Sequence, residues 1–453
     1  MNLSEKFILG CRYVLPSPFS IAILLTLLTA GLAWGLTAPT SQTTSAILQI
    51  GQYWQKGFWD LLTFTMQMML ILVLGHALAL SPVLSRLIHR VSRLCDSTSK
   101  AAFFVCLITM TFGLLNWGLG LIIGAVFARK IGDQAAHQGN VINYPLVGAA
   151  GYIGMLVWHG GLSGSATLKV AEPDHFLISQ MGQLPVTETI FSFMNMSVNL
   201  ALLIILPLLF YWLGKNTSNY QCPNLPKDLT NAEPPTPSVN PIGAEKLDLS
   251  PWFSKFFAIL MLCQAIYIAF IVPEHISLNF LSLNFINFIL FAFGLLAFKN
   301  IQSYMLALEE AIVGSVGILI QFPLYAGIAG IIQYSGLIHV FSDFIVEVAT
   351  QQTYPLYVML SSALVNIFVP SGGGQWAVQG PILVEAATAL NVPKASGIMA
   401  FAYGDQLTNM LQPFWALPLL GITKLKAYQV LPYTVLCMLI GFIVFGLGLW
   451  FLA

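Results

Sequence analysis

Long apolar segments separated by short polar ones run through most of the chain. The segments of spanning length fall at residues 19–36, 60–80, 144–166, 195–213, 252–272, 280–298, 313–334, 396–420 and 428–452. Each is close to the ~20 residues that an α-helix needs to cross a bilayer. The pattern predicts an all-α polytopic membrane protein with about nine transmembrane helices.

Two further apolar stretches, 101–128 and 354–390, are interrupted by NWGLG and PSGGGQ. Each is long for one span and short for two, so we expect two re-entrant hairpins, which enter and leave on one side of the membrane. Cytoplasmic loops collect lysine and arginine. With hairpins and a cytoplasmic N-terminus, all of the 18 Lys and Arg except Lys56, Lys169 and Lys394 fall inside. With two full spans they divide evenly, so we expect the N-terminus inside and the C-terminus outside.

The polar segment 215–250, rich in Pro, Asn and Thr, predicts a cytoplasmic linker between a first half, 1–214, and a second half, 251–453. The halves share a plan. Asn116 and Ser371, at the two hairpin tips, follow Ser81 and Ser335 at nearly equal distances. Each hairpin is followed by a helix broken by glycine or polar residues, at 144–168 and 396–420. Because the hairpins enter from opposite sides, the halves form an inverted repeat, which is common among secondary transporters.

The four breaks predict a shared polar site. Broken backbone at membrane depth persists only where protein buries it or it lines a watery cavity. Helix N-termini there favour an anion, whereas unwound carbonyls favour a cation. We expect the tip glycines to let the chain reverse and approach a ligand closely. Trp117, Trp376 and Trp415 lie in the breaks, where an indole can hold an apolar tail. Seven others lie at the ends of apolar runs, as interface anchors do: Trp34, Trp54, Trp59, Trp158, Trp212, Trp252 and Trp450.

Asp405 is the most informative acid, because an intramembrane carboxylate is costly and indicates a functional site. Asn409 shares its helix face. With Thr408 and Gln412 these residues are candidates to hold Na⁺, or Asp405 carries a proton. His159, beside Ser163 and Ser165, is either a proton or ligand group or a satisfied interior histidine. No Lys or Arg lies within a break, which favours a small monoanion with an apolar tail as the substrate.

Composition excludes several classes of protein. The chain is 57% hydrophobic and 8% charged, with formal net charge zero and a mean hydropathy of +0.79. No basic region indicates nucleic acid, and the six scattered cysteines indicate neither a metal site nor a disulfide framework. No phosphate-binding G-x-x-x-x-G-K-[ST] loop is present. ATP coupling in this chain is therefore not expected. We expect a transporter rather than an enzyme, with no cofactor apart from a coupling Na⁺ or H⁺.

NWGLGLIIGA, WHGGLSGSATL, VPSGGGQWAVQGP and GDQLTNMLQPFWALP closely resemble the bacterial short-chain fatty acid transporter family, within the ion transporter superfamily. The resemblance covers nearly the whole chain except the linker. It implies uptake of acids such as butyrate or acetoacetate across the inner membrane, an elevator-type motion and a homodimer. The tips read Asn-Trp-Gly and Pro-Ser-Gly-Gly-Gly rather than the Ser-Asn-Thr of better-known superfamily members, which leaves the coupling ion open.

From the residues and the resemblance together, two sets of site residues are predicted. The substrate set is Asn116, Trp117, Gly118, Ser163, Ser165, Ser371, Gly372, Gly373, Gly374, Gln375 and Trp376. The coupling-ion set is Asn116, Asp405, Thr408, Asn409 and Gln412.

Three other functions remain open at this point. A transporter of dicarboxylates or other organic anions would keep the same architecture. An intramembrane hydrolase would use Ser371, His159 and Asp405, although Ser371 does not lie in a G-x-S-x-G turn. A passive channel would show flux that no ion gradient drives uphill.

Overall fold

The computed structural model describes residues 16–37, 43–217, 220–221, 242–273 and 277–453. Within them the regular secondary structure is helical apart from two short antiparallel strands, β1 (Val141–Ile142) and β2 (Tyr220–Gln221), paired with Val141 opposite Gln221. The all-α fold expected from the sequence is confirmed. Residues 222–241 of the expected linker, and residues 1–15 at the N-terminus, lie outside the described residues.

The helices of the first half are α2 (Pro18–Thr37), α3 (Thr43–Phe58), α4 (Leu62–Ala79), α5 (Pro82–Ser92), α6 (Thr98–Leu115), α7 (Trp117–Gln138), α8 (Tyr144–Ala150), η1 (Ile153–Leu156), η2 (Trp158–Gly160), α9 (Ser165–Lys169), α10 (Ile178–Met181) and α11 (Phe193–Asn216). Those that follow are α12 (Glu245–Asp248), α13 (Pro251–Ile266), η4 (Tyr267–Ile271), α14 (Leu283–Ala297), α15 (Ile301–Ile312), η5 (Val313–Ser315), α16 (Val316–Ser335), α17 (Leu337–Val348), α18 (Tyr354–Phe368), α19 (Gly372–Ala389), α20 (Lys394–Thr408), η6 (Asn409–Leu411), α21 (Pro413–Thr423) and α22 (Ala427–Leu452).

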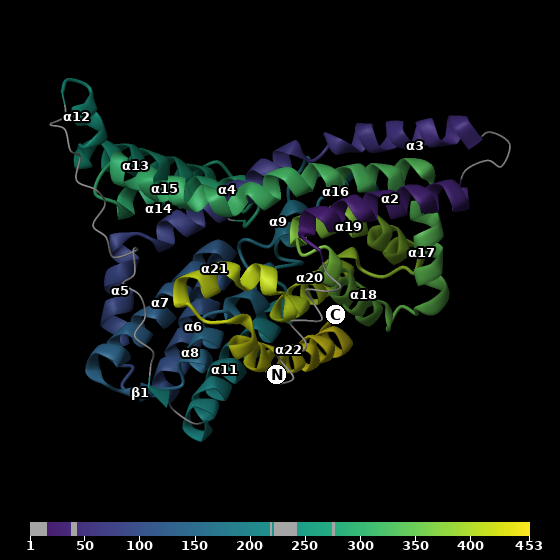
Figure 1. The fold of residues 1–453 in the computed structure, drawn as a ribbon. Coiled ribbons are helices and arrows are strands. Elements are labelled where there is room, and N and C mark those ends of the chain that lie inside the picture. The colour runs from purple at the N-terminus through teal and green to yellow at the C-terminus, as the bar shows by residue number, and fades with distance from the viewer. Residues whose placement is uncertain (1–15, 38–42, 218–219, 222–241, 274–276) are drawn as a thin grey trace.

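Two groups of helices are visible in Figure 1. Helices α2, α3, α4 and α13 to α16 run along the top, and α6 to α8, α11, α18 and α20 to α22 lie below them. Helices α5 and α17 descend at opposite edges of the molecule. Each follows a long helix of the upper group, α4 or α16, and precedes an interrupted pair, α6 and α7 or α18 and α19. The same order of elements therefore occurs twice.

The burial of each helix matches its apolar pattern. On α7, residues 117–125 are all buried, as are residues 396–408 of α20. A helix that is apolar all round and buried belongs in the interior of a bundle. By contrast, α2 and α13 expose large apolar side chains, such as Leu27 and Phe256, as helices facing lipid do.

Seven segments among the described residues are long and apolar enough to cross a membrane: Pro18–Thr37, Leu62–Ala79, Thr98–Leu115, Phe193–Asn216, Pro251–Ile271, Ile301–Ser335 and Ala427–Leu452. Two shorter apolar helices are Leu283–Ala297 and Tyr354–Phe368. The multi-pass membrane architecture is thus confirmed. The count of about nine spans, the re-entrant course of the hairpins and the orientation of the termini stay predictions.

Candidate functional site

The predicted breaks all occur in the structure. Asn116 separates α6 from α7, and 369–371 separate α18 from α19. The first broken helix divides into α8, η1, η2 and α9, and the second into α20, η6 and α21. Each half therefore carries one interrupted helix pair and one broken helix.

The breaks of the two halves meet at Gly372. A Cβ atom placed on Gly372 would lie 2.8 Å from Oγ of Ser165 and 2.8 Å from a ring carbon of Trp158. It would also lie 3.0 Å from Cε1 of His159. The tip of the second pair thus packs directly on the broken helix of the first half.

Capping of a helix occupies the polar side chain at each tip. Asn116 accepts a hydrogen bond from the amide of Leu119 at 2.8 Å and donates one to the carbonyl of Ile71 at 2.9 Å. Ser371 accepts from the amide of Gly374 at 3.2 Å. Such caps satisfy amides that a helix start leaves free. They explain why Asn and Ser stand at these positions without requiring a ligand.

Ser163 links the two breaks of the first half, because its Oγ accepts from the amide of Trp117 at 2.9 Å. Gly118 allows close packing on α4, since a Cβ there would lie 3.1 Å from Cδ1 of Leu72. The predicted substrate roles of Asn116, Ser163 and Gly118 stay predictions.

The tip glycines do not reverse the chain as expected. None of Gly372, Gly373 and Gly374 has a positive φ, and all three are helical residues of α19. The reversal lies before them, where Ser371 is extended, with φ −161° and ψ 100°. The glycines serve close packing instead: a Cβ on Gly374 would lie 2.3 Å from Cδ2 of Tyr325.

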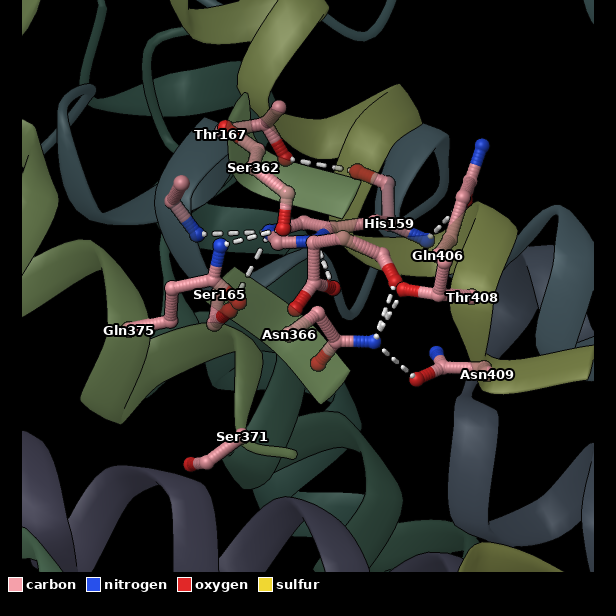
Figure 2. A network of polar contacts seen from close by, with 12 residues as sticks. His159, Ser165, Thr167, Ser362, Asn366, Ser371, Gln375, Gln406, Thr408 and Asn409 are labelled. Atoms are coloured by element: carbon pink, nitrogen blue, oxygen red, sulfur yellow. Dashed lines mark hydrogen bonds and ion pairs between the residues drawn. The ribbon is translucent and has the colours of Figure 1, made fainter. Parts of the chain in front are cut away.

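Asp405 is fully buried and belongs to a buried polar network, of which Figure 2 labels His159 and Asn366 among others. Its Oδ2 lies 2.8 Å from Nδ1 of His159. The other ring nitrogen, Nε2, accepts a hydrogen bond from the amide of Ala166 at 3.1 Å. A nitrogen that accepts carries no proton, so His159 is neutral and Nδ1–H donates to Asp405. The histidine therefore orients the carboxylate without neutralising it.

Asn366 of α18 joins the predicted coupling-ion residues. Its Nδ2 donates to the carbonyl of Asp405 at 2.7 Å, and to Oγ1 of Thr408 and Oδ1 of Asn409 at 3.0 Å each. Nε2 of Gln412 donates a hydrogen bond to the carbonyl of Asn366 at 2.9 Å. All four predicted second-half residues thus surround Asn366, as Figure 2 shows for Thr408 and Asn409. Asn366 is not among the residues predicted from the sequence, although it shares a face of α18 with Ser362, four residues earlier.

Four buried oxygens around this network lack a hydrogen-bond partner: Oδ1 of Asp405, Oδ1 of Asn366, Oγ of Ser362 and Oε1 of Gln375. Their residues are linked to one another. Gln375 donates to the carbonyl of Ser362 at 2.9 Å, and a Cβ on Gly404 would lie 2.8 Å from Cβ of Ser362. Three of these oxygens can only accept, whereas the Ser362 hydroxyl can also donate, and the neighbouring Gln406 has one unpartnered donor, Nε2. Because buried polar atoms are almost always paired, the excess of acceptors suits a ligand that donates or carries positive charge.

A small cavity lies at the N-terminus of α19. Its volume is about 20 Å³, and it is lined by Met68, Trp117, Met155, Trp158, Ile318, Phe322, Ser371, Gly372, Gly373 and Trp415. Only Ser371 among these carries an aliphatic hydroxyl, and none carries a charge. The cavity therefore combines an apolar wall with the free amides of a helix start.

Two expectations about tryptophan change. Trp158 is not an interface anchor: it is 4% exposed, lines the cavity and stacks on His159 with ring centroids 4.4 Å apart. Its apolar run ends at a break in the helix rather than at the membrane surface. Trp376 is 1% exposed and packs on Phe401, and it is not among the lining residues. Trp117 and Trp415 both line the cavity.

A second charged cluster lies at the end of the first broken helix. Lys169, expected in an outside loop, is buried, with Nζ 2.5 Å from Oε2 of Glu172. Gln67 of α4 donates to Oε1 of Glu172 at 3.1 Å and to Asn284 of α14 at 3.0 Å. This ion pair ties the broken helix to α4 and α14. Its cation is matched by Glu172, so it leaves no free positive charge for a substrate.

The hydrolase alternative lacks its nucleophile. Ser371 caps α19 and has no hydrogen bond to His159; Ser165 does, at 3.1 Å. Ser165, His159 and Asp405 resemble a catalytic triad in order, but Nε2 of His159 already accepts from a backbone amide, and all three side chains are fully buried. None of the three lines the cavity. The chain of hydrogen bonds is structural.

A family model described as short chain fatty acid transporter matches residues 2–452. A provisionally named short-chain fatty acid transporter of Escherichia coli (strain K12) is 36% identical over 437 residues, 96% of either chain. A relative of the same provisional name in Haemophilus influenzae (strain ATCC 51907 / DSM 11121 / KW20 / Rd) is 34% identical over 454 residues, 97% of this chain and 96% of its own.

Among solved structures, the Alcanivorax borkumensis YdaH transporter shares the fold, with a TM-score of 0.56 at 14% identity over 95% of this chain and 98% of that one. The family and the relatives are named as transporters and not as enzymes, which confirms that expectation.

Proposed function

The chain belongs to the short-chain fatty acid transporter family, and we propose that it imports short-chain fatty acids such as butyrate or acetoacetate by symport with a cation. The observation that carries the proposal is the state of Asp405. Its carboxylate is fully buried, its Oδ1 has no partner, and the histidine that contacts its Oδ2 is neutral. Among the described residues no Lys or Arg pairs with it. A buried carboxylate in this setting takes up a cation or a proton.

The cation site we propose comprises the four unpartnered oxygens of Asp405, Asn366, Ser362 and Gln375. Thr408, Asn409 and Gln412 hold Asn366 in place around it. Oxygen ligands of this kind suit Na⁺, and protonation of Asp405 would satisfy the same orphaned carboxylate oxygen. Gln375, expected to bind substrate, lies in this cluster rather than in the cavity lining.

The substrate occupies the cavity at the start of α19. Its carboxylate meets the free amides at Gly372 and Gly373, where the helix dipole places about half a positive charge. Its short tail lies among Trp117, Trp158 and Phe322. Contact of Gly372 with His159 places this pocket beside the cation site. Binding of the cation to Asp405 thereby organises the tip that receives the acid.

Transport proceeds as an elevator in this proposal. The interrupted pairs and broken helices, with α11 and α22, form the moving unit, and α2 to α4 with α13 to α16 form the static one. Helices α5 and α17 connect them at opposite edges (Figure 1). The halves are an inverted repeat, the protein works as a homodimer in the inner membrane, and the N-terminus is cytoplasmic.

The cavity disfavours dicarboxylates. A second carboxylate would lie among Met68, Ile318 and Trp415 without a cation or a second helix start to meet it. Monocarboxylates with an apolar tail fit the lining better.

The test is uptake of labelled butyrate into proteoliposomes under separately imposed Na⁺ and pH gradients. We expect accumulation above equilibrium under one of them, which names the ion. Equilibration without accumulation indicates a channel. No uptake of butyrate, with uptake of a dicarboxylate, overturns the substrate assignment.

A further inference from the structure

We propose that Trp117 and Trp415 form the end wall of the substrate cavity and set the longest fatty acid that the protein accepts. The inference rests on the proposed function, because it takes the cavity to be the substrate site. It adds which side chains limit the chain length of the substrate, because the family and the relatives give only the class of acid and not the residues that select it.

The cavity has a polar end and an apolar end. The polar end is the start of α19, an 18-residue helix, at Ser371, Gly372 and Gly373. Trp158 and Phe322 lie next to this end, because a Cβ on Gly372 would lie 2.8 Å from Trp158 and one on Gly373 would lie 2.9 Å from Phe322. An acid with its carboxylate at the amides therefore passes these two rings first.

Trp117 and Trp415 lie one ring further away. The ring of Trp117 is 6.0 Å from that of Trp158, and it packs edge-to-face on Trp415 with centroids 5.2 Å apart. Neither tryptophan is among the three nearest neighbours of an added Cβ at the tip glycines, whereas Trp158 and Phe322 are. Two interlocked indoles are rigid and large, so they close this side of the cavity more firmly than flexible side chains would.

The indoles also carry unused polar groups. Trp117 and Trp158 are each 4% exposed, and the Nε1 atom of each lacks a hydrogen-bond partner. Buried indole N–H groups usually find an acceptor. An acid in the cavity, or a water bound with it, supplies one. The Nε1 donor of Trp158, beside the polar end, is an observation independent of the helix start and points to an anionic or accepting ligand.

The volume sets the scale. A cavity needs roughly 10–15 Å³ to hold one water, so the 20 Å³ found here holds about one. Even butyrate requires the lining to move, and Met68 and Met155 are flexible side chains suited to this. The indole pair of Trp117 and Trp415 is rigid and cannot move aside in the same way. A methylene that extends past the wall therefore clashes with the indoles. Hydrophobic pockets discriminate between substrates that differ by one methylene by about 10–200-fold.

The experiment measures competition by unlabelled acids of increasing length against labelled butyrate uptake in proteoliposomes. The variants are Trp415→Phe and Trp117→Phe, which shorten the wall with little loss of packing. Trp376→Phe is the matched control, a buried tryptophan with an unpartnered Nε1 that does not line the cavity. Thermal stabilisation of detergent-purified protein by the same acids reports binding without transport.

We expect the apparent affinity for hexanoate relative to butyrate to rise about tenfold in either wall variant and to stay unchanged in Trp376→Phe. The proposal is overturned if the hexanoate-to-butyrate affinity ratio is unchanged in both wall variants. It is also overturned if these variants lose binding of every acid tested, or if the ratio shifts equally in Trp376→Phe. If the wild type accumulates butyrate but the ratio does not move, this inference alone fails. If the wild type binds no acid in either assay, the proposed function fails with it.

Discussion

The Nδ1 atom of His159 lies 2.8 Å from Oδ2 of Asp405, a contact between residues 246 positions apart in the chain. It joins the broken helix of the first half to that of the second. Because Ala166 donates to the other ring nitrogen, the contact is a hydrogen bond from a neutral imidazole. Asp405 is thereby held in place while its charge remains to be balanced, which is the property that a coupling-ion site requires.

Gly372→Ala will abolish most uptake while the protein still folds. The added methyl would lie 2.8 Å from Ser165 and from Trp158, and 3.0 Å from His159, so the tip must move away from the cation site. We expect at least a tenfold loss of initial butyrate uptake rate. Gly446→Ala on α22 is the control, since nothing lies within 4 Å of its added Cβ. Equal uptake by both variants would show that close contact at the tip is unimportant.

Asn366→Ala will weaken cation dependence. The substitution removes the shared donor to Asp405, Thr408 and Asn409, and one unpartnered oxygen of the proposed site. We expect a cation half-saturation concentration raised about tenfold and stability lowered by about 1–3 kcal/mol. Asn287→Ala is the control: its amide is also buried with an unpartnered Oδ1, but it bonds to Gln67 on α4. A matching change in half-saturation in the control would refute a specific role for Asn366.

Glu172→Gln will destabilise the protein through Lys169. The lysine would keep a buried charge without its partner, which typically costs about 3–5 kcal/mol. Replacing both, as Lys169→Met with Glu172→Leu, should restore much of the melting temperature. Asp96→Asn removes the partner of Lys100 in an exposed pair and should leave the melting temperature unchanged. If Glu172→Gln melts like the wild type, the buried pair contributes nothing.

Acid will destabilise the segment that follows the first broken helix. His175 donates to the carbonyl of Gly182 at 2.9 Å and accepts from the amide of Leu177 at 3.2 Å, so its ring is neutral. Burial lowers the pKa of His175 and outweighs the hydrogen bond to the Gly182 carbonyl, which raises it. The unfolded chain then binds the proton more readily, so stability falls as pH drops below about 6.5. His175→Gln should reduce the fall in melting temperature between neutral and acid pH, whereas His137→Gln, at an exposed histidine, should not.

The sequence identified the breaks and Asp405 because both violate the rules of membrane helices. Glycine, proline and a carboxylate inside apolar runs are costly unless the fold uses them. The same reasoning overlooked Asn366, since a single amide in an apolar helix is also typical of ordinary helix packing. Its role depends on partners about forty residues away, which only the fold brings together.

Trp158 and Lys169 show a second limit of the sequence. Both stand at the end of an apolar run. At such a position a tryptophan usually anchors the helix at the membrane interface, and a lysine usually lies in a solvated loop. Here the run ends because the helix breaks inside the protein, and both side chains are buried. The pattern cannot distinguish the end of a helix at the membrane surface from a break at depth, because both show as polar residues after apolar ones.

The most direct test of the account compares butyrate accumulation by the wild type and Asp405→Asn in proteoliposomes, under the cation gradient that drives the wild type. Asn keeps the size of the side chain and removes the charge, so we expect gradient-driven accumulation to disappear in a folded protein. Asp96→Asn, at an exposed carboxylate, should accumulate normally. Full accumulation by Asp405→Asn under the same gradient would contradict the assignment of the coupling-ion site.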